Sequence, residues 1–157
     1  MRSSRENEES SGRKPLRIFV DANTIVSGLV FEGNEALLLK LGKIGLCSLV
    51  TTHYVIDEVS RALRAGEFRL SEKEAVSLIS YVNRCITVCE NMTPEQLRKY
   101  LSTLQDKKDA HVLAAFQELK CDMMVTGDKE LLQKVPKART TRRALGILLS
   151  VKQDDRS

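Results

Sequence analysis

Four acidic side chains that lie beside core residues are the part of this sequence most able to do chemistry. Asp21 and Asp128 each follow a short apolar run, whereas Glu58 and Asp109 each share the apolar stripe of a predicted helix. A carboxylate in such a position must find a partner or lose its charge. If the four side chains converge, their mutual repulsion predicts a bound divalent cation. Mg²⁺ and Mn²⁺ are the candidates, because they prefer oxygen ligands.

Each of these acids also has an ordinary structural explanation. Asp21 could bond its own backbone in a turn, and Asp128 could cap the helix that follows it. Asp109 could simply favour a helix N-terminus through the helix dipole. Glu58 could be an exposed helical glutamate beside Asp57. These explanations weaken together, because all four acids lie where predicted strands or helices begin or end.

The composition is that of an ordinary globular domain. The chain has 157 residues, of which 42% are hydrophobic and 29% charged, so we expect one domain with a single core. No apolar run approaches the ~20 residues that span a bilayer, and the N-terminus lacks the apolar stretch of a secretory signal. We therefore expect a cytoplasmic protein with no membrane partner. The net charge of +4 is compatible with a polyanionic partner.

Cysteine and histidine give little support for a zinc site. The four cysteines include no C-x-x-C pair, and Cys47 and Cys121 lie among strand-like apolar residues. We expect reduced core thiols. The chain has only two histidines, and His111 should point to a different helix face from Asp109. We expect His111 to be a structural or surface residue.

Strand and helix signals alternate along the chain, which predicts an α/β fold: a three-layer sandwich with a central, mostly parallel sheet. We expect residues 1–15 to form a disordered tail, 16–150 one domain and 151–157 a flexible C-terminal tail. The expected strands are 16–20, 46–51, 86–89, 122–126 and 138–140. The expected helices are 34–41 with Asn34 as its cap and Gly42 just past its end, 52–64, one capped by Ser71 with Glu74, one capped by Thr93, 109–119, 128–133 and a closing helix that carries Leu145 and Leu148.

Sheet topology gives an independent reason to group two of the acids. In open parallel sheets, ligands bind outside the carboxyl ends of the strands. Asp21 and Asp128 lie just past two predicted strand ends. We therefore expect both carboxylates at the same edge of the sheet.

Four short motifs around the acids resemble those of the PIN-domain family in order and approximate spacing. They are an Asp-Ala-Asn-Thr turn after the first strand, a helical Asp-Glu-Val, a Lys-Lys-Asp-Ala-His-Val-Leu-Ala-Ala helix opening and a Thr-Gly-Asp-Lys-Glu-Leu-Leu turn. The similarity covers residues 16–149. PIN domains are α/β sandwiches with a central parallel sheet. Many are Mg²⁺- or Mn²⁺-dependent ribonucleases, notably the VapC-type toxins of toxin–antitoxin modules.

The resemblance implies roles for particular residues and partners. Asp21, Glu58, Asp109 and Asp128 become an acidic tetrad that is both catalytic and metal-binding. Asn23 and Thr126 match polar positions that support such a site. The implied activity is hydrolysis of RNA phosphodiester bonds by an activated water. The implied partners are an RNA substrate, an antitoxin protein and a second copy of the chain.

Basic residues near the acids are candidates for contacts to the RNA backbone. Few aromatic residues (4%) leave little capacity for stacking on bases, so we expect recognition of RNA shape or help from a partner. The candidate basic residues are Lys107, Lys108, Lys129, Arg139, Arg142 and Arg143.

Two other functions remain open at the level of sequence. A PIN-like fold could serve as a non-catalytic RNA-binding or assembly module. Alternatively, the turn Asp21-Ala22-Asn23-Thr24 is similar to the nucleophile loop of phosphatases of the haloacid dehalogenase type. Asn23 stands where that loop carries a second Asp, the general acid, which argues against this alternative.

Overall fold

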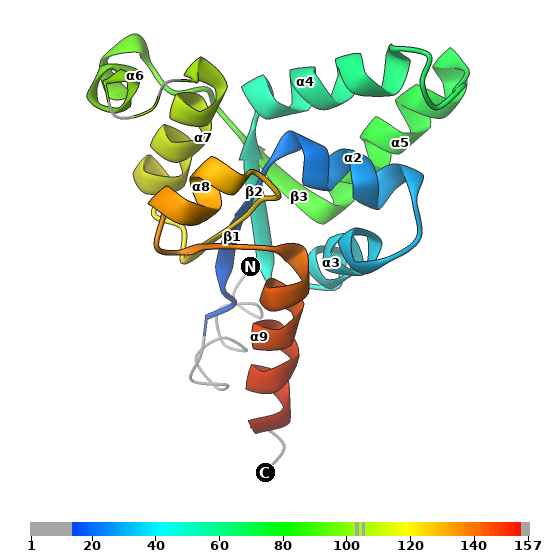
Figure 1. Ribbon diagram of the computed structural model, residues 1–157. Helices are drawn as coiled ribbons and strands as arrows, with labels where there is room; N and C mark the ends of the chain where they lie inside the picture. Colours follow the sequence, from blue (N-terminus) through cyan, green and yellow to red (C-terminus); the bar gives the residue numbers. More distant parts are fainter. Residues whose placement is uncertain (1–13, 103, 105, 155–157) are drawn as a thin grey trace, which may run out of the picture.

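A five-stranded, all-parallel sheet forms the centre of the computed structural model, which describes residues 14–102, 104 and 106–154. The strand order is β3-β2-β1-β4-β5 (Figure 1). The strands are β1 (Arg17–Val20), β2 (Ser48–Thr52), β3 (Ile86–Cys89), β4 (Met123–Val125) and β5 (Ala138–Arg139). Residues 18–20 and 123–125 are buried, as expected for central strands of a sheet covered on both faces. The predicted α/β sandwich is therefore confirmed.

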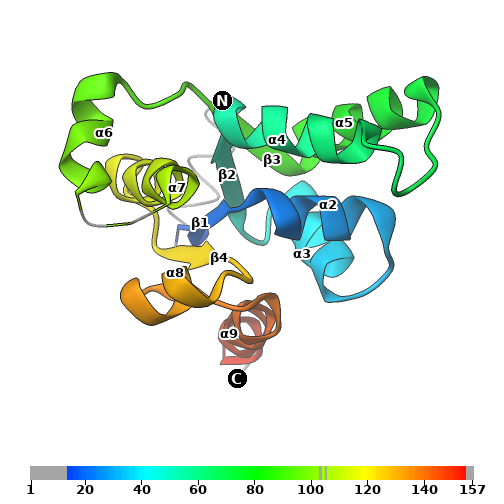
Figure 2. The same cartoon turned by 45° about the horizontal axis from the view of Figure 1, so that its top comes forward.

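Helices connect the strands and cover both faces of the sheet. Figures 1 and 2 show α2 and α3 on one side of β1 and α6 and α7 on the other. The two sides follow from right-handed crossovers, because the chain adds strands first on one side of β1 and then on the other. The described helices are α2 (Ala22–Val30), α3 (Asn34–Lys43), α4 (His53–Arg64), α5 (Glu72–Cys85), α6 (Pro94–Leu101), α7 (Lys107–Glu118), α8 (Lys129–Lys134) and α9 (Thr141–Asp154).

The strand order creates a switch point between β1 and β4. From β1 the chain moves outward through β2 and β3, then returns to place β4 on the opposite side of β1. The helices after β1 and β4 therefore leave toward opposite faces and open a crevice at the carboxyl ends of these two strands. Asp21 follows β1 directly, and Asp128 follows β4 after two residues. Both lie at this crevice, as predicted.

Several helix ends form as the sequence predicts. Ser71 and Glu74 make a reciprocal capping box at the start of α5, and Thr93 makes another with Gln96 at the start of α6. In each box the hydroxyl oxygen accepts from a first-turn N–H, and the N3 side chain accepts from the N-cap N–H. These bonds are local, which explains why the sequence alone identifies them.

Two predictions near α2 and α3 are wrong. Helix α2 is absent from the predicted elements, because its β-branched residues and Gly28 give it a weak intrinsic helix propensity. Asn34 does not cap α3: Gly33 is the N-cap, with a φ of 148° that side chains rarely adopt. Gly42 lies inside α3. A Cβ there would stand 2.6 Å from the Cys85 carbonyl oxygen, so this glycine permits close packing.

The predicted tails are only partly within the described chain. Residues 1–13 lie outside it, and the domain boundaries at residues 16 and 150 stay predictions. Helix α9 continues to Asp154, into the segment that we expected to be a flexible tail. In the part of the chain that the structure describes, no helix has the length and apolarity needed to cross a bilayer.

Buried thiols occupy the amino end of the sheet. Cys47 and Cys121 precede β2 and β4, and burial raises the pKa of each thiol to about 11. Cys85, at the end of α5, is also buried, and Cys89 is half-buried. All four cysteines are free, as predicted. A neutral thiol is a comfortable core residue, so this end of the sheet carries no charge conflict.

Candidate metal centre at the carboxyl end of the sheet

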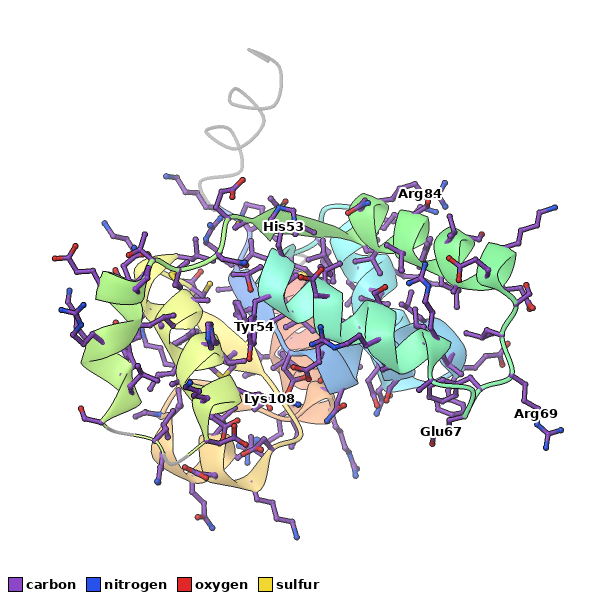
Figure 3. The ribbon with its side chains drawn as sticks, turned by 90° about the horizontal axis from the view of Figure 1, so that it is seen from above. His53, Tyr54, Glu67, Arg69, Arg84 and Lys108 are labelled. Atoms are coloured by element: carbon purple, nitrogen blue, oxygen red, sulfur yellow. The ribbon has the colours of Figure 1, made fainter. Side chains whose placement is uncertain are left out.

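All four predicted acids line one cavity of about 240 Å³ at the carboxyl ends of β1 and β4. The cavity lies between α2, α4, α7 and α8, and Figure 3 looks down onto this end of the molecule. Residues distant in sequence therefore converge as expected. The lining residues are Asp21, Ala22, Asn23, Tyr54, Val55, Glu58, Asp106, Lys108, Asp109, Val112, Asp128 and Leu131.

Asp21 is buried and fixed at the centre of this edge. It is the N-cap of α2, and its Oδ1 accepts a hydrogen bond from the Thr24 N–H at 3.0 Å. Its Oδ2 accepts from the Thr126 hydroxyl at 2.5 Å. The ordinary explanation of Asp21 as a local cap is thus correct, and yet the same carboxylate faces the cavity. Each oxygen retains a further lone pair.

Asp128 and Thr126 form the β4 side of the site. Asp128 is the N-cap of α8, and its Oδ1 accepts from the Leu131 N–H at 3.0 Å. The Asp128 N–H donates to the Thr126 hydroxyl oxygen at 3.1 Å. Thr126 therefore links Asp21 to Asp128 and fixes their relative position. This is the geometry expected of a supporting residue.

Asp109 is the acid of the cavity whose pKa is raised most clearly. It lies in the first turn of α7 and is 8% exposed. Burial, assisted by the charges of Asp128, Asp106, Glu130 and Asp21, raises its pKa from 3.8 to about 6. A cation or a proton would relieve this strain.

Glu58 and Asn23 lie at the margin of the site. Glu58 is half-buried on α4, and Asn23 is exposed in the first turn of α2. Both line the cavity. Glu58 is not among the carboxylates that raise the pKa of Asp109. Glu58 is therefore a lining residue with no marked effect on the charge of Asp109.

Sequence reasoning missed a fifth acid, Asp106. It is the N-cap of α7, where its Oδ1 accepts from the Lys108 N–H at 2.8 Å, and it lines the cavity. The signal was available: an Asp immediately before a helix is a preferred N-cap. The predicted helix begins at Asp109, so Asp106 lies outside the predicted elements. Asp21, Asp106 and Asp128 cap three helices whose positive dipole ends partly offset their charge.

The donor set fits a hard divalent cation. The charged groups that line the cavity are five carboxylates and one lysine, with no cysteine or histidine in the lining. Among the described residues, no group of three His, Cys, Asp or Glu side chains is arranged to hold a metal ion. Joint coordination would therefore require side-chain rotations, for example of Asp109 and Asp128. Oxygen ligands of this kind suit Mg²⁺ or Mn²⁺ far better than Zn²⁺.

Of the six predicted RNA-contacting residues, only Lys108 lines the cavity. Lys107 and Lys129 are exposed, and each is next in sequence to a lining residue, Lys108 and Asp128 respectively. Arg142 and Arg143 are exposed on α9. The Arg139 guanidinium donates to the Pro136 and Ala138 carbonyl oxygens at 2.6 and 2.9 Å, which turns it back onto its own loop. Contact of these residues with RNA stays a prediction.

A stacked pair of rings stands at the α4–α7 side of the cavity. Tyr54 on α4 and His111 on α7 have ring centroids 3.8 Å apart, with planes inclined by 6°. The half-buried His111 is thus a structural residue, and burial lowers its pKa. Figure 3 shows Tyr54 on the side of α4 that faces α7.

Comparison with known proteins decides the family. The family model described as "PIN domain" matches residues 17–130. The chain belongs to the PIN-domain family. Membership of the PIN-domain family excludes the phosphatase alternative. The turn formed by residues 21–24 only approximates the nucleophile loop of such phosphatases. No curated protein matches the chain significantly.

Solved structures agree on the fold. PAE2754 from Pyrobaculum aerophilum superposes with a TM-score of 0.66 at 21% identity, over 86% of this chain and 96% of that one. VapC20 from Mycobacterium tuberculosis, described as a sarcin–ricin loop cleaving toxin, superposes with a TM-score of 0.57 at 16% identity. This second match covers 75% of this chain and 95% of VapC20. At these identities, the likeness establishes a shared fold.

Proposed function

We propose that this PIN domain is a metal-dependent endoribonuclease that hydrolyses RNA phosphodiester bonds. The main support is that Asp21, Glu58, Asp109 and Asp128 line one cavity. In this cavity, burial and neighbouring acids raise the pKa of Asp109 to about 6. A buried carboxylate that faces other acids is unfavourable unless a function requires it. The chain also belongs to a family whose members are generally nucleases, which supports phosphodiester hydrolysis as the reaction.

The residues divide into ligands and supports. Asp21 and Asp109 are the best candidates for direct metal ligands, because they are the most buried acids of the cavity. Asp128 would complete the ligand set or act through water, and Glu58 would ligate or orient the attacking water. Thr126 holds Asp21 by its hydroxyl. Mg²⁺ or Mn²⁺, when bound, would neutralise the phosphodiester charge and lower the pKa of the attacking water.

Asp106 and Lys108 extend this assignment. Asp106 adds negative charge next to Asp109 and, as the cap of α7, fixes the backbone that carries it. Lys108 is the lysine of the cavity lining and would contact a substrate phosphate. The expected products carry 5′-phosphate and 3′-hydroxyl ends, because water attacks instead of the ribose 2′-oxygen.

The decisive experiment is incubation of the purified protein with varied RNAs, with Mn²⁺ or with a chelator. We expect cleavage only with Mn²⁺. Asp21→Ala should abolish it, whereas Asp57→Ala should cleave like the parent, because Asp57 is exposed beside Glu58 and outside the cavity lining. Cleavage that survives in Asp21→Ala, or that continues in the chelator, would contradict the proposal.

The alternative is a PIN domain that binds RNA or partner proteins without catalysis. It is favoured by one observation: no three of the described acids, histidines or cysteines are arranged to hold a metal ion. A melting temperature unchanged by millimolar Mn²⁺, together with absence of cleavage, would support it.

A toxin role would add partners. The similarity in fold to VapC20 motivates a search for an antitoxin protein, a homodimer and a cytoplasmic setting. Co-purification with the product of a neighbouring gene, and the mass of the assembly in solution, would test these expectations. A monomer with no co-purifying protein would count against a toxin–antitoxin module.

A further inference from the structure

The Tyr54–His111 ring pair has a geometry that the proposed metal site does not require. The rings come from different helices, α4 and α7, and lie nearly parallel with centroids 3.8 Å apart. Tyr54 lines the cavity, whereas His111 is not among its lining residues. His111 therefore covers one face of the tyrosine ring, and the remainder of the ring borders the cavity.

Tyr54 is held firmly in this position. Its backbone N–H, one of the free donors at the start of α4, donates to the Asn91 side-chain oxygen at 2.7 Å. Asn91 follows β3, so the β3–α6 connection fixes the backbone at the start of α4, and the ring itself packs against His111 of α7. A ring that is ordered beforehand loses little conformational freedom when a ligand stacks on it.

The Tyr54 ring is also tied to the acids by its place in the cavity lining. Glu58 follows Tyr54 by one helical turn on α4, and both residues line the cavity together with Asp109. A group that contacts the Tyr54 ring would therefore lie next to the carboxylates. No other aromatic side chain lines the cavity in the described part of the chain.

The charge of the cavity makes such a contact useful. Five carboxylates and one lysine line it, so an RNA backbone that approaches would meet net repulsion. A stacking contact between a base and an uncharged ring does not depend on the negative charge of the cavity. Base–aromatic stacking is also tolerant of sequence, because every base has a π-face.

We propose that Tyr54, supported by His111, is the surface on which an unpaired base beside the cleaved phosphodiester stacks. Such stacking needs an unpaired nucleotide at the cleavage point, as in a single strand, loop or bulge. This inference rests on the proposed ribonuclease function and names a residue that would contact its substrate. It differs from the expectation drawn from the low aromatic content, because it rests on the position of one ring and not on the number of rings.

The alternative is that the ring pair only joins α4 to α7. A double-mutant cycle between ring and base separates the two roles. A short single-stranded RNA that the parent binds is labelled with fluorescein, and a series of copies carries an abasic nucleotide at each position in turn. Dissociation constants are measured by fluorescence anisotropy with Ca²⁺ present, and a gel verifies that the RNA stays intact.

We expect the abasic nucleotide to weaken binding to the parent and to Tyr54→Phe by about tenfold, the scale of one stacking contact. In Tyr54→Leu the intact RNA should bind about tenfold more weakly, and the abasic RNA should bind no worse than the intact one. Tyr81→Leu is the matched control: Tyr81 is a half-buried tyrosine on α5, outside the cavity, and should behave like the parent.

Equal losses for both RNAs in Tyr54→Leu would show a structural role and overturn the proposal. If Tyr54→Leu does not fold, the abasic scan on the parent alone decides. No position at which the abasic nucleotide weakens binding would equally overturn it. The two proposals can fail separately. If the protein cleaves RNA but the effects of Tyr54→Leu and of the abasic nucleotide are independent, only the stacking role of Tyr54 is refuted. If the two effects are coupled but no RNA is cleaved, only the ribonuclease function is refuted.

Discussion

The two ends of the sheet bury ionisable groups with opposite consequences. At the carboxyl end, burial and neighbouring acids raise the pKa of the Asp109 carboxyl to about 6. At the amino end, burial raises the pKa of the Cys47 and Cys121 thiols to about 11. The thiols stay neutral at pH 7 and pack as core residues. The Asp109 carboxyl is mostly ionised at pH 7, a charge state that its burial and its acidic neighbours oppose.

Space alone does not separate the two ends. At the amino end, α3 approaches so closely that a Cβ on Gly42 would stand 2.6 Å from both the Cys85 carbonyl oxygen and Leu49 Cδ1. Hollows of about 350 and 480 Å³ also lie at that end, beside Cys47 and Cys121. The cavity of about 240 Å³ at the carboxyl end differs in being lined by five carboxylates. One end of the sheet therefore holds neutral core thiols, and the other keeps charge for a ligand.

The largest effect should come from the acid under most strain. Asp109→Asn removes a proposed ligand while keeping the size of the side chain. We expect cleavage with Mn²⁺ to fall by at least about 100-fold, because several kcal/mol of charge stabilisation are lost and 1.36 kcal/mol corresponds to tenfold. Initial rates at saturating Mn²⁺ measure it. A variant as fast as the parent would remove Asp109 from the site.

A substitution at the amino end of the sheet should change the free energy of unfolding and leave the rate of cleavage unchanged. Gly42→Ala forces a methyl group against the Cys85 carbonyl oxygen and Leu49, so the free energy of unfolding should fall by about 1–3 kcal/mol. Cleavage per folded molecule should be unchanged. Gly146→Ala is the control, because its Cβ would meet no atom within 4 Å and α9 should gain slightly in stability. Urea unfolding of both variants provides the comparison.

An effect on stability of similar size, opposite in sign, should appear at Asp109 without metal. Its folded-state pKa lies above the ordinary 3.8, so the folded protein retains a proton that the unfolded chain loses as pH rises from about 4 to about 6. Stability falls over this window, and the full cost is present above it. Asp109→Asn should therefore exceed the parent by about 1–3 kcal/mol at pH 7.5 and match it near pH 4.

This prediction is checked by urea unfolding in a chelator at both pH values. Asp57→Asn, which replaces an exposed acid on α4, should follow the parent throughout. If Asp109→Asn shows no gain in stability at pH 7.5, the Asp109 carboxylate is not under strain.

What the sequence predicted depended on the range of the interactions. The caps at Ser71 and Thr93 rest on bonds between neighbours, and a single sequence contains all the residues they need. Asp21 and Asp128 were grouped correctly, because parallel strands bring their carboxyl ends to one edge. Helix α2 could not be predicted, because its weak local propensity is overcome by burial of Ile25 against the core.

The ring pair shows the same limit at the site. Tyr54 and His111 are 57 positions apart, and no local pattern links them; only the packing of α4 against α7 makes them one surface. Asp106 is different, because its role as a helix cap was within reach of the sequence.

Direct titration with Mn²⁺, followed by the loss of the free-ion electron paramagnetic resonance signal, addresses the cation site itself. The parent and Asp57→Ala should bind Mn²⁺ at saturable sites, and Asp21→Ala should bind it far more weakly or not at all. A parent that leaves millimolar Mn²⁺ free in solution, or an Asp21→Ala variant with parental affinity, would contradict the account.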